Sequence, residues 1–136
     1  MYSYNDKNQK IALIGCGYWG TIIAKTLIKL KFKNILIFDT DQRNTKTLKK
    51  KFSNLRICEK YKEILADEEI KNIFFATPPS KNFTIVRKAL EYRKNIFLEK
   101  PGVTKISELN LLNSLAIKNK CNLMFGYIYC YNNYIQ

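Results

Sequence analysis

The sequence predicts an α/β fold built on a doubly wound, mainly parallel sheet with helices on both faces. Short apolar runs alternate with segments of helical periodicity, which is typical of successive strand–helix–strand units. Several of the runs are apolar at consecutive positions, as strands covered on both faces should be. A glycine-rich turn also joins the first apolar run to the first helical segment.

The strands are assigned to the apolar runs that turn or polar residues bound. They are expected at residues 11–15, 34–38, 55–58, 72–76, 95–98 and 121–125. Helices are expected between them, at residues 21–31, 42–52, 62–66, from about residue 80, and at 106–118. Right-handed crossovers between these strands would build an open sheet.

The longer helices show one apolar side at a spacing of three or four residues. These inward positions are Ile23, Leu27 and Leu30; Phe83, Val86 and Leu90; and Leu109, Leu112 and Ala116. Ser80 is a suitable N-cap for the fourth helix, and Thr104 or Ser107 for the fifth. No repeat, low-complexity tract or internal linker interrupts the series.

Length and composition are those of one globular domain. The chain has 136 residues, 46% of them apolar, which is enough for a substantial core. No run reaches the roughly 18 apolar residues of a membrane helix, and the polar start is unlike a signal peptide. We therefore expect a cytoplasmic protein without a membrane partner.

The cysteines and the net charge indicate neither a metal site nor a dedicated nucleic-acid site. The four cysteines form no C-x-x-C pair and the chain has no histidine, so reduced thiols are favoured over zinc. The formal charge of +13 will attract polyanions at low salt. Its lysines are spread along the whole chain, however, which favours solvated helix faces over specific nucleic-acid binding.

The glycine motif Gly15-x-Gly17-x-x-Gly20 carries the strongest functional signal. In a strand–turn–helix context, Gly15 permits the tight turn and Gly17 lets a pyrophosphate approach the backbone. Gly20 lets the helix pack closely on the sheet. The N–H groups at the start of the helix then face the phosphates, so the motif predicts dinucleotide binding.

Asp39 supports this interpretation, because it lies 19 residues after Gly20 at the end of the second strand. A carboxylate there accepts hydrogen bonds from the adenosine ribose and repels the extra phosphate of NADP, which favours NAD. Arg43 leaves NADP as the alternative, since arginine binds a 2′-phosphate well. A second interpretation makes Asp39 a cap of the next helix, a part that Thr40 and Asp41 can also play.

Two further loops follow strands whose carboxyl ends should lie at the same edge of the sheet. Residues 75–80 contain paired prolines that fix a rigid loop, and Thr77 is placed to meet the cofactor. Residues 97–102 carry Glu99 and Lys100 directly after an apolar strand. Lys100 is suited to bind a substrate hydroxyl or transfer a proton, and Glu99 to hold that lysine or a cofactor hydroxyl. An ordinary surface ion pair is the competing interpretation.

Taken in order, these residues resemble the Gfo/Idh/MocA family, the group of glucose-fructose oxidoreductase and inositol dehydrogenase. The resemblance runs from about residue 9 to residue 135 and rests on residues 14–20, Asp39, and residues 76–80, 99–101 and 126–127. It implies an N-terminal Rossmann domain that binds NAD, a C-terminal domain with a large open sheet, and hydride transfer to or from a sugar or polyol carbon. The form of the glycine loop is also similar to members that act on sugar nucleotides.

The resemblance also implies roles for single residues. Lys100 matches the catalytic lysine that orients substrate and takes part in proton transfer. The pyrophosphate loop is matched by Gly15, Gly17, Tyr18, Trp19 and Gly20, with Cys16 counted among them. Asp39 matches the ribose contact, and Thr77 and Pro78 match the nicotinamide-side loop. Asn82 and Tyr127 stand where the family often has histidine, and Asn82 is counted among the residues expected to bind the cofactor.

We expect residues 1–125 to form the dinucleotide-binding domain and residues 126–136 to begin a C-terminal substrate domain that this chain lacks. A shortened form, a disrupted gene product and a natural short protein are all compatible with the sequence. The aromatic residues near the end predict homo-oligomers formed through that segment. A non-catalytic NAD-binding or interaction module is the main alternative function. Nucleic-acid binding and methyl transfer explain fewer of the motifs.

Overall fold

A computed structural model describes residues 6–131 and contains a six-stranded, all-parallel sheet with the strand order β3-β2-β1-β4-β5-β6. The strands are β1 (Lys10–Ile14), β2 (Asn34–Phe38), β3 (Arg56–Ile57), β4 (Asn72–Phe75), β5 (Asn95–Leu98) and β6 (Leu123–Phe125). The helices are α1 (Tyr18–Lys29), α2 (Gln42–Lys51), α3 (Tyr61–Ala66), α4 (Pro79–Glu91) and α5 (Ile106–Asn119), followed by a 3-10 turn η1 (Ile128–Tyr131). The predicted α/β class and doubly wound sheet are confirmed.

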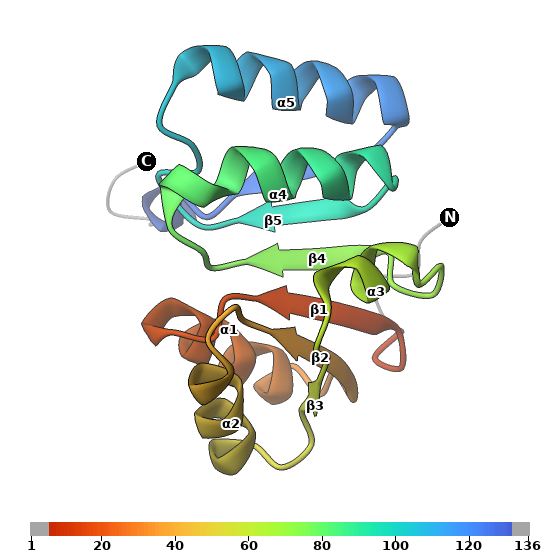
Figure 1. Cartoon of the computed structure of the whole chain (residues 1–136), viewed down its shortest axis with the longest axis vertical. Helices are drawn as coiled ribbons and strands as arrows, with labels where there is room; N and C mark the ends of the chain where they lie inside the picture. Colours follow the sequence, from red (N-terminus) through yellow and green to blue (C-terminus); the bar gives the residue numbers. More distant parts are fainter. Residues whose placement is uncertain (1–5, 132–136) are drawn as a thin grey trace.

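Two apolar clusters, one on each face of the sheet, form the core. Ile11 and Leu13 of β1 lie in one cluster, together with buried residues of α1, β2 and α2. Ala12 and Ile14, which point to the other face, lie in the second cluster with α3, α4 and α5. β1 is therefore buried on both sides, which explains its uninterrupted apolar run. In Figure 1, α1 and α2 lie beside β1 and β2, whereas α4 and α5 lie at the end of the sheet that contains β5.

Several boundaries differ from those expected. α1 begins at Tyr18, three residues before Thr21, because Thr21 is the residue whose N–H closes the first helical bond, to the Gly17 carbonyl. Its buried side is Gly20, Ala24 and Leu27, while Leu30 is 51% exposed. The helical spacing was therefore predicted correctly, but of the expected inward positions only Leu27 is buried, because the buried side of the helix is centred on Ala24.

The expected helix caps were wrong for two helices. α4 starts at Pro79, with Pro78 as its N-cap, so Ser80 already lies inside the first turn. The N-cap of α5 is Lys105, while Thr104 directs its hydroxyl to Glu108. Proline at the first helical position provides the required φ angle without a side-chain cap.

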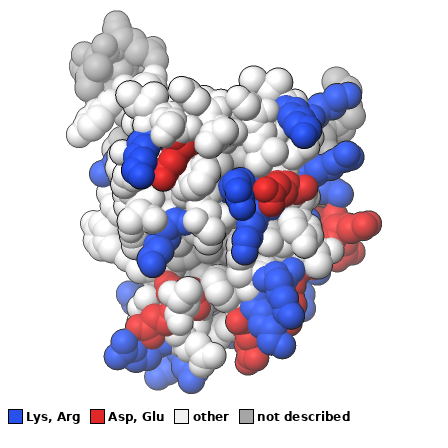
Figure 2. Space-filling view, turned by 45° about the horizontal axis from the view of Figure 1, so that its top comes forward, with Lys and Arg blue, Asp and Glu red and all other residues white. Residues whose placement is uncertain are grey.

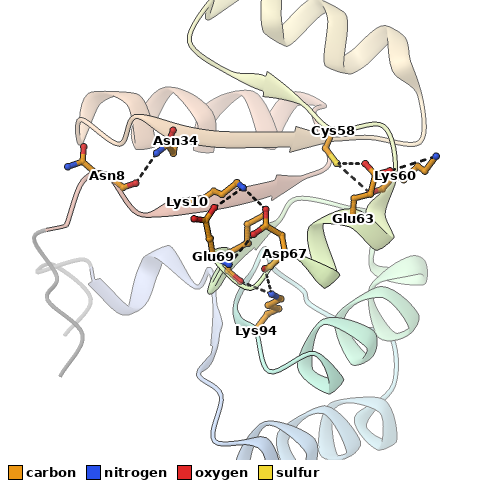
Figure 3. Close-up of polar contacts among 10 residues, drawn as sticks. Asn8, Lys10, Asn34, Cys58, Lys60, Glu63, Asp67, Glu69 and Lys94 are labelled. Atoms are coloured by element: carbon orange, nitrogen blue, oxygen red, sulfur yellow. Dashed lines mark hydrogen bonds and ion pairs between the residues drawn. The ribbon is translucent and has the colours of Figure 1, made fainter.

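The amino-terminal edge of the sheet is held by a cluster of charged residues (Figure 3). The Lys10 ammonium lies 2.5 Å from Asp67 and 3.2 Å from Glu69. The buried Lys94 ammonium donates to the backbone carbonyls of Asp67 and Ile70, at 2.7 and 2.8 Å. Burial lowers the pKa of Lys94, with a further contribution from the charge of Lys71. These contacts fix the turn before β4 at the edge opposite the predicted site.

The remaining charges are distributed over the surface. Figure 2 shows one face on which basic side chains are interspersed with acidic ones and with uncharged surface. None of the helices among residues 6–131 combines the length and apolarity that crossing a membrane requires.

Candidate functional site

The parallel register brings the predicted functional segments to one edge of the sheet. Ile14 is paired with Phe38 and Phe75, and Phe75 with Leu98, so these four strands end level with one another. Backbone bonds extend this alignment by one residue at three positions, from Gly15 to Phe38, Ala76 to Ile14 and Glu99 to Phe75, all within 2.8–2.9 Å. The glycine loop, Asp39, Thr77 and Lys100 therefore follow directly from neighbouring strand ends.

The glycine loop shows which of its glycines the protein itself requires. Gly15 has a φ of +91°, and a side chain there would collide with the carbonyl of Ala76. A Cβ on Gly20 would collide with the carbonyl of Gly15, so Gly20 permits the close packing of α1. A Cβ on Gly17 would meet nothing within 4 Å in the described structure. The fold needs glycine at positions 15 and 20, whereas at position 17 it leaves open space.

The amino terminus of α1 adjoins this open space. Gly17 is the N-cap, and within residues 6–131 no side chain caps the helix and no acidic residue stands in its first turn. The first N–H groups of a helix have no intrahelical partners, and they carry the positive end of its dipole. This end of α1 is therefore suited to bind an anion such as a phosphate.

Asp39 is tied to the glycine loop by hydrogen bonds. Its Oδ2 accepts from the backbone N–H of Cys16 at 2.8 Å and from Asn44 Nδ2 at 3.2 Å. Its Oδ1 accepts from the Asp41 N–H at 2.8 Å. An ionised carboxylate has about four acceptor positions, so these three bonds leave capacity on Oδ1 for a further donor. Sequence reasoning missed Asn44, because an amide side chain five residues away gives no recognisable pattern.

Asp41, rather than Asp39, caps the next helix. Its side chain accepts from the backbone N–H of Arg43 at 2.9 Å and also binds the Arg43 guanidinium, with a shortest distance of 2.7 Å. The side-chain bond from Arg43 is the main reason that the pKa of Asp41 is lowered, and the same bond raises the pKa of Arg43. Arg43, although highly exposed, is thus engaged by a carboxylate.

Thr77 and Asn82 connect two of the loops. The Thr77 hydroxyl donates to Asn82 Oδ1, and Asn82 Nδ2 donates to the carbonyl of Gly102, both at 2.5 Å. Asn82 is fully buried. It therefore fixes the loop that contains Pro78 relative to the loop after β5. Direct contact of Thr77, Pro78 or Asn82 with a cofactor stays a prediction.

Lys100 and Glu99 leave β5 at the same edge. The exposed Lys100 ammonium lies 5.5 Å from the centroid of the Trp19 ring, so it reaches the glycine loop. The Glu99 carboxylate lies against Gly126, where a Cβ would be 3.1 Å from Oε1. Sequence reasoning placed both residues at the site but did not indicate the contact between Lys100 and Trp19.

Cys16 is the buried member of the glycine loop. Its thiol lies 3.6 Å from the carbonyl of Phe38 and is 5% exposed. Burial, with a smaller contribution from Asp39, raises the pKa of this thiol to about 12. The side chain is therefore neutral at ordinary pH and adds no negative charge beside the open space at Gly17.

A shallow hollow of about 370 Å³ flanks the loop on the side of α2. Its lining includes Tyr18, Ile22, Asn44, Thr47 and Lys51. Thr47 and Lys51 were not predicted as site residues, because only the packing of α1 beside α2 brings them to the loop.

Comparisons with known proteins agree with this geometry. An uncharacterized oxidoreductase of Schizosaccharomyces pombe is 29% identical over 119 residues, which cover 85% of this chain and 32% of the relative. The chain thus spans about a third of the length of the curated relatives it matches.

Two solved structures are similar to most of the chain. GenD2 from gentamicin A biosynthesis, solved in complex with NAD, has a TM-score of 0.85 at 23% identity, over 96% of this chain and 38% of its own. The UDP-N-acetylglucosamine 3-dehydrogenase GnnA of Acidithiobacillus ferrooxidans has a TM-score of 0.82 at 20% identity, over 93% of this chain and 41% of its own. These likenesses establish the fold.

The sequence profile of the Gfo/Idh/MocA oxidoreductase family, with its NAD-binding Rossmann fold, matches residues 9–127, which include every predicted site residue. The chain belongs to the Gfo/Idh/MocA oxidoreductase family and contains its NAD(P)-binding domain.

Proposed function

We propose that this chain is the cofactor-binding part of an NAD-dependent dehydrogenase whose substrate is a sugar, a sugar nucleotide or a polyol. One observation carries the cofactor assignment: a Cβ on Gly17 would meet no described atom of the protein within 4 Å, so the absence of a side chain leaves space that a bound molecule can fill. That space lies at the uncapped start of α1, one residue after Cys16, whose backbone N–H donates to the Asp39 carboxylate. A pyrophosphate and its adjoining ribose fit this combination of open backbone, helix terminus and acceptor.

The residues divide the work along the edge of the sheet. The amino end of α1 binds the phosphates, and Asp39 accepts from the ribose through the free position on Oδ1. Thr77 and Pro78 border the nicotinamide side, held by Asn82. NAD held by these residues would supply the chemistry of hydride transfer to or from the substrate carbon. Lys100 donates a hydrogen bond to the oxygen on that carbon. During reduction of a carbonyl the Lys100 ammonium gives a proton to this oxygen, and during oxidation of the alcohol the Lys100 amine takes the proton back.

NAD is favoured over NADP by the charges at the end of β2. The Asp39 carboxylate, which lies beside the glycine loop, would repel the extra phosphate that NADP carries on its ribose. Arg43, which would otherwise attract that phosphate, is bound to Asp41 by its guanidinium and its backbone N–H. Arg43 is therefore neutralised by its own neighbour.

The substrate class rests on the family and on its named members. GnnA acts on a sugar nucleotide according to its name, and the same fold is found in this chain. We assign residues 1–125 to cofactor binding and residues 126–136 to the approach to a substrate-binding region. Residues 1–5 and 132–136 of these ranges lie outside the described part of the chain. We place the protein in the cytoplasm, where NAD is available.

Titration with NADH tests the cofactor assignment, because Trp19 is the only tryptophan and lies in the loop. Energy transfer from Trp19 to NADH is expected to saturate. Asp39→Asn should weaken binding by about tenfold or more, since hydrogen bonds to charged groups contribute about 1.5–3 kcal/mol. Asp6→Asn, the same chemical change at an exposed residue near the other edge, is the control. Folded wild-type protein without saturable binding would contradict the assignment.

We also propose self-association through the segment after β6. Ile128 and Tyr129 are 59% and 67% exposed, and exposed apolar clusters commonly mark contact surfaces. Light scattering after size exclusion should show oligomers that Ile128→Glu dissociates. Ile117→Glu, at an isoleucine of α5 that is 80% exposed, should leave the oligomers intact. A strict monomer at high concentration would rule the proposal out.

A further inference from the structure

The contact between Trp19 and Lys100 joins two segments that are not neighbours in the sheet. Trp19 lies in the first turn of α1, after β1, and Lys100 follows β5. β4 stands between these strands, so the contact spans two strand spacings, about 10 Å, across the carboxyl edge. The ammonium nevertheless lies 5.5 Å from the ring centroid, within the range of about 6 Å for a cation–π interaction.

The indole that faces the ammonium also contacts a second aromatic ring. Tyr18 packs edge-to-face against it, with ring centroids 5.6 Å apart and an interplanar angle of 84°. Trp19 is 39% exposed and Tyr18 is 77% exposed, so the pair is partly open to solvent. Tyr18 and Trp19 are thus an oriented aromatic pair at the mouth of the loop, with one face turned to Lys100.

An aromatic ring affects the Lys100 ammonium differently from a carboxylate. Within residues 6–131 the Lys100 ammonium makes no salt bridge, although Glu99 is its neighbour in the chain. A carboxylate would occupy the N–H donors of the lysine, whereas a ring face attracts the charge and leaves donors available. Lys100 is therefore restrained and still able to donate.

We propose that Trp19 is a positioning residue, which holds the Lys100 ammonium over the glycine-loop side of the site so that its free N–H donors meet the substrate oxygen. This inference rests on the proposed function, because it assigns the way in which Lys100 is oriented for that reaction. It also links the two halves of the site, since the backbone of Trp19 belongs to the cofactor loop.

Nuclear magnetic resonance of the full chain, after reductive ¹³C-methylation of its lysines, tests the inference. Lys100→Arg identifies the Lys100 signal by its loss. A methyl group above an indole face is shifted upfield by the ring current. The wild-type Lys100 signal should therefore lie upfield of the other lysines, move to their position in Trp19→Leu, and lie between these positions in Trp19→Phe. A partly restored upfield shift in Trp19→Phe distinguishes a contact with an aromatic ring from a contact with any large side chain.

Each outcome decides the inference. An unshifted Lys100 signal in the wild type, or an equal shift in Trp19→Leu, overturns it. Circular dichroism of each variant verifies folding, and Lys100→Met provides a second measurement from the other partner. Removal of the ammonium should change the emission of Trp19 in that variant, and unchanged emission would count against the contact. NADH titration of the wild type tests the proposed function independently of this inference. If NADH binds but the Lys100 signal is not shifted upfield, only the positioning of Lys100 is refuted. If the signal is shifted but NADH does not bind, only the cofactor assignment is refuted.

Discussion

At the scale of single residues, the site depends on which polar groups are already engaged. Asp39 uses three acceptor positions within the protein, and these bonds orient its carboxylate toward the glycine loop. Asp41 uses its carboxylate to cap α2 and to bind Arg43. Two acidic residues two positions apart thus differ in their partners: Asp39 binds the backbone of the glycine loop, and Asp41 binds an arginine.

This division predicts a change of cofactor preference in Asp41→Ser. Serine keeps an oxygen for the N-cap but removes one negative charge and releases Arg43. The ratio of NADPH to NADH affinity should rise by about tenfold, which corresponds to about 1.4 kcal/mol. Adding Arg43→Ala to this variant should cancel the gain. Titration of all three proteins with both reduced cofactors measures the effect, and an unchanged ratio in Asp41→Ser would refute the assigned role of Arg43.

At the scale of elements, the sequence predicted each strand of the sheet and the alternation with helices. These follow from local patterns: apolar runs, helical spacing and the glycine turn. The start of α1 was missed because it depends on the backbone bond from Thr21 to Gly17. The buried side that carries Ala24 was missed because it depends on packing against β1. The links from Asn82 to Gly102 and from Lys100 to Trp19 were missed for a related reason, since their partners are distant in sequence and chemically ordinary.

The cluster that holds the amino edge predicts stability that depends on pH. Burial alone would raise the pKa of Asp67, but hydrogen bonds from Lys10 and from the Glu69 backbone outweigh it and lower the pKa below its usual value. The ionised form therefore stabilises the fold above about pH 4, and this contribution is lost as the pH falls through the lowered pKa.

Urea unfolding of Asp67→Asn and wild type tests this prediction. The substitution should lower the free energy of unfolding by about 1 kcal/mol at pH 7, because the pair with Lys10 is only partly exposed. The loss should be smaller at pH 3, where part of the wild-type Asp67 is already protonated. Glu91→Gln, which breaks the more exposed pair with Arg87, should have a smaller effect at both pH values. An equal cost of Asp67→Asn at pH 7 and pH 3 would show that the charge of Asp67 is not involved.

At the scale of the whole molecule, the two edges of the sheet carry different groups. Charged side chains lock the turn between α3 and β4 at the amino edge, where Lys10 and Lys94 bind it. The carboxyl edge carries loops with an uncapped helix terminus, open space at Gly17 and a restrained Lys100. This is the edge at which doubly wound sheets bind their ligands. The ion pairs that hold the fold and the proposed cofactor site thus lie at opposite ends of the strands.

The central claim is that Gly17 is glycine for the sake of a bound dinucleotide and not for the fold. Calorimetric titration of Gly17→Ala with NADH, paired with its thermal unfolding, tests this claim most directly. We predict at least about tenfold weaker binding, with an unfolding midpoint close to that of the wild type, because the added methyl group meets no described atom within 4 Å. Gly15→Ala should instead lower the midpoint, because its methyl group collides with Ala76. A Gly17→Ala protein that is folded and binds NADH as tightly as the wild type would contradict the account.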